Sequence, residues 1–302
     1  MKKALVLALM LAACGKAKPK EGIDPGQPEQ GSAVAGSAGS AGSAGSAGSA
    51  VAQGSAGSGA GSAEVVIPPY TPAADVPQAI KDAVAATDRA PDDRKLDAGR
   101  KPAEVLAFFK LAPGQKVGEL FAGGGYTTEL MARVVGPTGK IYAENTKEIM
   151  DKFARKPWSE RAAKPVMANV VTEEQPIEAP FGTDGKDLDL VVTVLNYHDT
   201  VNMKADRAKM NKAVFDSLKK GGYYGIVDSS AADGSGTRDT ETLHRIDEKV
   251  VQTEVAAAGF KPAGESNVLR NQDDKRDWSS SPKAAGEKRG TSDRFVLLFQ
   301  KP

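Results

Sequence analysis

The 302-residue chain carries 40 basic and 39 acidic side chains but only one cysteine and two histidines. These counts exclude a disulfide framework and a zinc cluster built from several cysteine and histidine ligands. Five lysines and no acid lie in residues 1–20, so the remainder holds 35 bases against 39 acids and gives no electrostatic reason to expect a nucleic-acid partner.

Residues 1–13 have the pattern of a secretion signal. Two lysines precede the ten-residue apolar run 4–13, which has about half the length that a helix needs to span a bilayer. The sequence Leu11-Ala-Ala-Cys14 resembles the lipobox of bacterial lipoproteins, in which the signal is cut before the cysteine and the sulfur carries a diacylglycerol. The resemblance implies an exported protein anchored in a membrane by lipid on Cys14, on the periplasmic face, and Gly15 favours the outer membrane. An idle thiol after an ordinary signal is the alternative.

Residues 14–72 are expected to form a disordered linker. In 31–62, 29 of 32 positions are Gly, Ala or Ser, which leaves almost no side chain to bury. The Ala-Gly-Ser triplets lack an apolar face, so they predict no structural repeat. A coil of about 50 such residues spans roughly 35–42 Å on average, and it would tether a folded domain formed by residues 73–302.

The folded part alternates between helix and strand patterns. Helices are predicted over 77–87, 102–109, 126–135, 147–155, 203–218 and 243–255, and strands over 116–121, 140–144, 165–171, 188–195, 223–227, 262–268 and 295–300. The segment 188–195 is almost entirely apolar and rich in β-branched residues, as a strand covered on both faces should be. The alternation predicts an α/β fold with a doubly wound, Rossmann-like, seven-stranded, mostly parallel sheet and helices on both faces.

A glycine-rich turn follows the first predicted strand. Ligands of doubly wound sheets bind at the carboxyl ends of the strands, next to the point where the strand order reverses. Gly123, Gly124 and Gly125 lie there, and they let the backbone approach a ligand and expose the N–H groups of the helix that begins at Tyr126. Thr128 replaces the third glycine of a nicotinamide fingerprint, and the Gly-Lys-Ser/Thr of a phosphate loop is absent from the sequence.

Two acids flank this turn. Glu119 precedes Gly123 by four residues, and Glu144 ends the second strand. A carboxylate in the second position can accept hydrogen bonds from both hydroxyls of a ribose, whereas one beside the turn suits an ammonium group. The pair favours a ligand that joins adenosine to an amino acid. The alternatives are a tight turn without a ligand, a helix-capping Glu119 and a solvated Glu144.

On these residues the chain resembles the class I S-adenosylmethionine-dependent methyltransferases, whose first motif is an acid followed by a Gly-x-Gly-x-Gly turn. The resemblance covers residues 102–302 and continues in two further motifs, 187–196 and 218–222. Four segments are similar to a bacterial group of predicted methyltransferases of unassigned substrate: 102–109, 196–199, 244–248 and 269–271. Phe121 departs from the pattern, because it stands at the first glycine of the turn.

The resemblance implies S-adenosyl-L-methionine as the cofactor. Position by position, it implies that Glu119 and the glycine turn hold the methionine portion, Glu144 the ribose, and that Asn196 lines the pocket after the fourth strand. The cofactor-binding residues expected on this basis are Glu119, Ala122, Gly123, Gly124, Gly125, Tyr126, Glu144 and Asn196. Glu173 and Glu174 are both candidates for the acid on the adenine side.

Methyl transfer from a sulfonium is an in-line displacement that depends mainly on alignment in a dry pocket. A base is needed only when the acceptor must lose a proton, and His198 is the best-placed candidate, with Asp228 orienting it or binding the acceptor. A His198 bonded to a loop carbonyl and an Asp228 that starts a turn are the alternatives. His244 and Arg245 are expected on a helix in a packing or ion-pair role, and no metal site is expected.

The predicted function is methyl transfer to a small-molecule or envelope-associated acceptor. The competing class is a membrane-tethered binding module that keeps the fold without transfer. The export signal favours this second class, because S-adenosylmethionine is made in the cytoplasm. The two acids favour the first, because a chain released from cofactor binding has little reason to hold both.

The lipid anchor is tested by Cys14→Ser. The variant should lose its lipid and leave the membrane fraction, because Cys14 supplies the only thiol of the chain. Fractionation followed by a salt wash measures the outcome, and a variant that stays in the washed membranes contradicts the lipoprotein interpretation.

Overall fold

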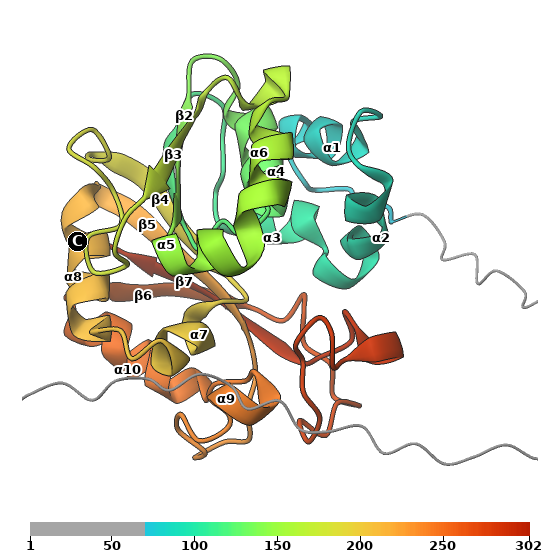
Figure 1. The fold of residues 1–302 in the computed structure, drawn as a ribbon, viewed down its shortest axis with the longest axis vertical. Helices are drawn as coiled ribbons and strands as arrows, with labels where there is room; N and C mark the ends of the chain where they lie inside the picture. The colour runs from blue at the N-terminus through green and yellow to red at the C-terminus, as the bar shows by residue number, and fades with distance from the viewer. Residues whose placement is uncertain (1–69) are drawn as a thin grey trace, which may run out of the picture. The chain divides into compact units, whose positions relative to one another are not determined.

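A seven-stranded sheet organises residues 70–302, which are the residues that the computed structural model describes (Figure 1). The predicted signal peptide, Cys14 and the linker up to residue 69 lie outside them. The strands are β1 (Lys116–Leu120), β2 (Lys140–Asn145), β3 (Val170–Glu174), β4 (Leu188–Val194), β5 (Leu218–Ser229), β6 (Lys261–Ser266) and β7 (Arg294–Gln300). Their order is β3-β2-β1-β4-β5-β7-β6, and only β7 runs in the direction opposite to the other six strands. The predicted fold class is confirmed.

The chain reverses its direction of travel across the sheet at β1. From β1 it continues to β2 and β3, and then it returns to the other side of β1 to form β4. The carboxyl ends of β1, β2, β4 and β5 therefore share one edge, and the turn after β1 lies at the reversal point, where doubly wound sheets bind ligands.

Helices cover both faces of the sheet (Figure 1). The first face carries α1 (Gln78–Ala85), α2 (Pro91–Arg100), α3 (Pro102–Phe108), α4 (Tyr126–Val135) and α6 (Arg155–Ala162). The second carries α7 (Tyr197–Asn202), α8 (Arg207–Ser217) and α10 (Glu248–Ala257), and the short helix α9 (Thr240–Leu243) lies in a connection. The short helix α5 (Lys147–Ile149) continues through the π-helical segment Met150–Ala154 into α6. In the described residues, no helix is long and apolar enough to cross a membrane.

Two apolar cores fill the space between the helices and the sheet. Neighbouring side chains of β4 point to opposite faces, so Val192 packs in the core under α4 while Val191 packs in the core under α8 and α10. Both side chains are fully buried. The unbroken apolar sequence of β4 follows from this burial on both sides.

Two expectations about the elements are wrong, and helix α2 was not predicted. The segment 165–171 is not a strand throughout, because Pro165–Met167 forms a 3₁₀ helix and β3 begins only at Val170. The helix predicted over 243–255 is broken, with α9 ending at Leu243 and α10 beginning at Glu248. The polar helix α2 has no apolar periodicity, yet Pro91 at its first turn and Arg100 at its last are helix-boundary signals.

Candidate functional site

The turn after β1 takes a left-handed path from its first residue. Phe121 has φ 52°, and Gly123 and Gly125 have φ 57° and 82°. A bulky residue rarely adopts this conformation, which glycine accepts without strain. Phe121 therefore follows the path that a glycine would take, and its ring compensates by packing in the second core at 5% exposure.

The glycine turn is docked on the end of β2 by four hydrogen bonds, one of which runs from Asn145 Nδ2 to the Gly123 carbonyl at 3.3 Å. The N–H of Phe121 donates to Glu144 Oε2 at 3.0 Å and the N–H of Ala122 to the Glu144 carbonyl at 2.8 Å. The N–H of Gly123 donates to Asn145 Oδ1 at 2.8 Å. The carboxyl end of β2 therefore determines the position of the turn.

Helix α6 covers the other side of the turn. Arg161 Nε donates to the Gly124 carbonyl at 2.6 Å. A Cβ on Gly125 would lie 2.7 Å from Arg161 Cδ, so glycine is required there by close approach as well as by its φ of 82°.

Glu144 is fully buried, but only one of its two carboxylate oxygens has a hydrogen-bond partner. Its Oε1 atom has no hydrogen-bond partner among the described residues. Burial raises the pKa of Glu144 to about 8, to which the nearby charges of Glu173 and Glu178 contribute. A buried polar atom without a partner costs about 1–3 kcal/mol, so a donor that reached this oxygen would relieve that cost. The alternative of a solvated strand end is wrong.

Glu119 has a different environment from that of Glu144. It is 3% exposed, and its Oε2 accepts a hydrogen bond from Thr128 Oγ1 in the first turn of α4. Burial raises the pKa of Glu119 to about 7, although the Thr128 hydrogen bond and the Arg161 charge lower it. This carboxyl links β1 to α4 through the Thr128 hydroxyl and does not cap the helix, since α4 has no side-chain cap hydrogen bond. Its contact with an ammonium group stays a prediction.

An apolar pocket lies at the carboxyl ends of β4 and β5. Tyr126 is the only one of the predicted cofactor residues that lines it, and its other lining residues are Arg100, Pro102, Val105, Leu106, Thr127, Leu130, Val194, Leu195, Val227, Leu269 and Arg294. The Arg100 guanidinium lies 4.4 Å from the Tyr126 ring centroid. Burial lowers the pKa of Arg294 to about 10, and the charges of Arg100 and Arg245 add to this effect. Arg294 is buried and Arg100 is half-buried, and two cations in an apolar pocket suit a ligand with an anionic group.

Asn196 connects β4 to the glycine turn. Its Nδ2 donates to the carbonyl oxygens of Phe121 at 3.2 Å and Val194 at 2.8 Å. The amide hydrogens are therefore committed to the backbone, and Asn196 fixes the spacing of two strand ends.

His198 and Asp228 meet where α7 begins beside the end of β5. Asp228 is fully buried, and its Oδ1 lies 2.8 Å from His198 Nδ1. Asp228 Oδ2 accepts from the backbone N–H of His198 at 2.8 Å, and Oδ1 accepts from the N–H of Ser229 at 2.7 Å. The structure thus brings the predicted base and its predicted orienting acid together, and neither follows its plain alternative.

Two further side chains surround the free nitrogen of His198. His198 Nε2 lies 3.3 Å from His244 Nδ1 and 3.3 Å from Asp199 Oδ1. Burial raises the pKa of Asp199, and burial together with the His198 charge lowers that of His244. Burial lowers the pKa of His198, but Asp228 and Asp199 outweigh it and the net shift is upward.

The expected helical position of His244 is wrong. The residue adopts φ 50° and ψ 50° at the end of α9, which turns its side chain away from a helical path. The two histidines are separated by 46 residues, so no local pattern in the sequence predicts that they meet. The only signal was that the chain has no other histidine.

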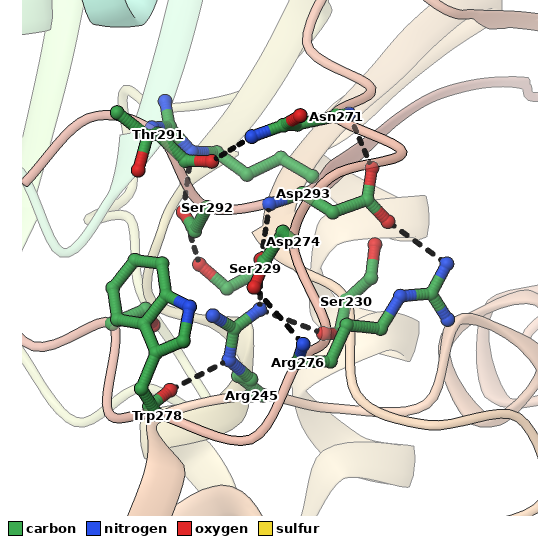
Figure 2. Close-up of polar contacts among 12 residues, drawn as sticks. Ser229, Ser230, Arg245, Asn271, Asp274, Arg276, Trp278, Thr291, Ser292 and Asp293 are labelled. Atoms are coloured by element: carbon green, nitrogen blue, oxygen red, sulfur yellow. Dashed lines mark hydrogen bonds and ion pairs between the residues drawn. The ribbon is translucent and has the colours of Figure 1, made fainter. Parts of the chain in front are cut away.

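The loop 267–293 is held by a buried ion-pair network (Figure 2). Arg245, which is fully buried, donates to Asp274 Oδ2 at 2.8 Å and to the Trp278 carbonyl at 3.0 Å. The backbone N–H groups of Asp293 and Asn271 donate to Asp274 and Asp293 at 2.6 and 2.8 Å. These residues stabilise the loop instead of offering free side chains to an acceptor.

The fold is shared with solved methyltransferases, although no family model matches the sequence. A candidate sarcosine dimethylglycine methyltransferase from Galdieria sulphuraria is 16% identical and superposes with a TM-score of 0.50, over 70% of this chain and 87% of that one. The chain has the Rossmann-like methyltransferase fold. An S-adenosylmethionine-dependent methyltransferase from Aquifex aeolicus is 18% identical at TM-score 0.49, over 70% and 97% of the chains. Fibrillarin from Aeropyrum pernix, with natively bound S-adenosyl-L-methionine, is 15% identical at TM-score 0.45, over 68% and 76%.

The buried carboxyl of Glu119 predicts a stability that depends on pH. Its pKa of about 7 in the folded chain exceeds the ordinary 4.5, so the stabilisation from its protonated form is complete below pH 4.5 and lost as the pH rises to 7. Glu119→Gln removes this loss and should exceed the wild type in unfolding free energy at pH 8 by up to about 3 kcal/mol. Urea unfolding at pH 4.5 and 8 measures the difference.

Glu129→Gln is the matched control. Burial raises the pKa of Glu129, but hydrogen bonds from Arg133 and Lys164 outweigh it and the pKa is lowered. This variant should therefore lose stability at pH 8. A Glu119→Gln variant that is also less stable at pH 8 contradicts the expected protonation.

Proposed function

We propose that the chain is an S-adenosyl-L-methionine-dependent methyltransferase that acts on a small-molecule or envelope-associated acceptor. The observation that carries the proposal is the unpartnered Oε1 of Glu144, buried at the carboxyl end of β2 beside the glycine turn. A ribose has two adjacent hydroxyl donors, and a carboxylate at this position can accept from them.

The residues of this edge fit the cofactor. Glu144 would hold the ribose, and the backbone of the turn Gly123–Gly125 would lie against the methionine portion. Glu173 is the stronger candidate for the adenine side, because it pairs with Glu144 in the register of β2 and β3 while Glu174 is engaged by Arg155 at the surface. When bound, the cofactor supplies an electrophilic methyl group on a sulfonium.

The acceptor would enter over the ends of β4 and β5. The pocket there is apolar, which excludes water from a displacement reaction, and it presents Arg100 and Arg294. These cations favour an acceptor or cofactor carboxylate over a cationic group. The chain, in our proposal, works as an exported lipoprotein, held at the periplasmic face of the outer membrane through Cys14.

Binding of S-adenosylhomocysteine tests the cofactor proposal. Calorimetry should show a micromolar dissociation constant, or roughly −8 kcal/mol. Glu144→Gln removes the charged acceptor and should weaken binding by about 1.5–3 kcal/mol. Because ribose donors favour the ionised form, the wild-type affinity should fall as the pH drops below about 8, and the variant should not show this dependence.

Asp216→Asn is the control for this measurement, since its carboxylate is exposed on α8 and paired with Lys212. It should bind S-adenosylhomocysteine like the wild type. Equal binding by wild type and Glu144→Gln removes Glu144 from the site, and no binding by either contradicts the proposed cofactor.

Label transfer separates an enzyme from a binding module. The full chain and His198→Ala are incubated with radiolabelled S-adenosylmethionine and an envelope extract, and label is counted in lipid, protein and small-molecule fractions. Loss of a positioned base lowers the rate by about 10²–10⁴, with the affinity for S-adenosylhomocysteine retained. Label that His198→Ala does not reduce keeps the enzyme and removes His198 as base. A chain that binds cofactor and labels no fraction of several extracts favours the binding module.

A further inference from the structure

Three potential metal ligands converge beside the end of β5. The atoms are His198 Nε2, His244 Nδ1 and Asp199 Oδ1, and all three lie within 4.8 Å of one another. Their separations are 3.3 Å from His198 to His244, 3.3 Å from His198 to Asp199 and 3.9 Å from His244 to Asp199. Two imidazoles and one carboxylate are a common ligand set for first-row transition metals.

The three separations match a four-coordinate ion. Ligands at about 2.0–2.2 Å from a tetrahedral metal lie about 3.3–3.6 Å apart, whereas adjacent ligands of an octahedral one lie about 2.8–3.1 Å apart. The two shorter separations agree with the tetrahedral value, and the third is slightly longer. The fourth position faces solvent, because the side chains of Asp199 and His244 are 32% and 36% exposed.

Asp228 fixes His198 in the form that binds a metal. The carboxylate accepts hydrogen bonds from the backbone N–H groups of His198 and Ser229. As an acceptor it also favours the form of His198 in which Nδ1 carries the proton and donates to Asp228. A neutral ring then carries its lone pair on Nε2, the atom that faces His244 and Asp199. This is the carboxylate–histidine arrangement that orients metal ligands.

The elements that carry the ligands are fixed to each other before any ion binds. Asn202, on the same short helix as His198 and Asp199, exchanges two hydrogen bonds with Thr240 of α9 at 2.8 and 3.2 Å. His244 keeps its left-handed conformation through Ser280, whose Oγ donates to the His244 carbonyl at 2.6 Å. Strained backbone of this kind persists where the surroundings impose it, as in ligand sites.

We propose that His198, Asp199 and His244 bind one divalent transition-metal ion, with Zn²⁺ as the probe, and that Asp228 is the positioning residue. The cation site stands without the proposed function. A role in binding an oxygen or nitrogen group of the acceptor rests on that function, and an ion on His198 Nε2 takes the lone pair that His198 would use as a base.

Metal binding is measured on the full chain made without a histidine tag, because a tag would exceed the two histidines of the chain. After removal of metal with a chelator, titration with Zn²⁺ should show one site of micromolar or tighter affinity. His244→Ala and Asp199→Asn should lose that site. Asp228→Asn should retain it with 10–100-fold weaker affinity, as expected for an orienting partner.

Substitution by Co²⁺ gives a readout that depends on geometry. Four-coordinate Co²⁺ absorbs visible light more strongly than the six-coordinate ion, so the wild type should show an intense visible band that His244→Ala lacks. Asp216→Asn, an exposed acid paired with Lys212, is the control and should bind like the wild type. Thermal unfolding of each chelated variant shows whether it is folded, and His244→Gln replaces His244→Ala if the latter is not.

The outcomes separate the two proposals. A folded wild type without a Zn²⁺ site overturns the metal proposal and leaves S-adenosylhomocysteine binding as it was, and so does a site that survives in His244→Ala and His244→Gln. If the site is present and S-adenosylhomocysteine does not bind, the proposed function fails alone. In the label assay, a base-only His198 predicts activity in His244→Ala, whereas a metal site used by the enzyme predicts its loss.

Discussion

The carboxyl edge of the parallel sheet forces three acids into the protein interior. Glu119, Glu144 and Asp228 end β1, β2 and β5 or lie close to their ends, and all are at most 3% exposed. A buried carboxyl must find donors or become neutral. Asp228 finds two backbone N–H groups and a histidine, Glu119 finds a threonine, and Glu144 finds one N–H group for two oxygens. Glu119 and Glu144 each have one donor, but among the oxygens of the three acids only Oε1 of Glu144 is both buried and without a hydrogen-bond partner in the described part of the chain.

Local patterns predict the centre of the fold better than its connections. The strand at 188–195 and the helix at 126–135 were predicted within one residue, because each combines a clear apolar pattern with flanking turn signals. The glycine turn and its acids were also visible, since their spacing is local. The pairing of His198 with His244 was not, because it depends on Ser280 and the loop 267–293, which hold His244 off the helical path.

That loop depends on charges removed from water. Arg245 is fully buried and pairs with Asp274 (Figure 2). Arg270 and Arg276 approach the buried carboxylate of Asp293. Breaking one such pair typically costs about 3–5 kcal/mol, because the remaining charge stays buried. The position of His244 therefore depends on these ion pairs. The edge of the sheet alone does not bring the two histidines together.

Phe121 gives the ligand site a mechanical property that a glycine at this position lacks. Its backbone begins the turn, and its ring is embedded in the core on the opposite side of the sheet from α4. With a glycine at position 121, the backbone of the turn could change conformation without moving a side chain. With Phe121, such a change must also move an aromatic ring among packed side chains. Entry and release of a ligand should therefore be slow relative to ordinary loop motion and should accompany rearrangement of that core. A ligand bound at the carboxyl edge of the sheet would then make the helices that pack on this core more rigid, although it does not touch them.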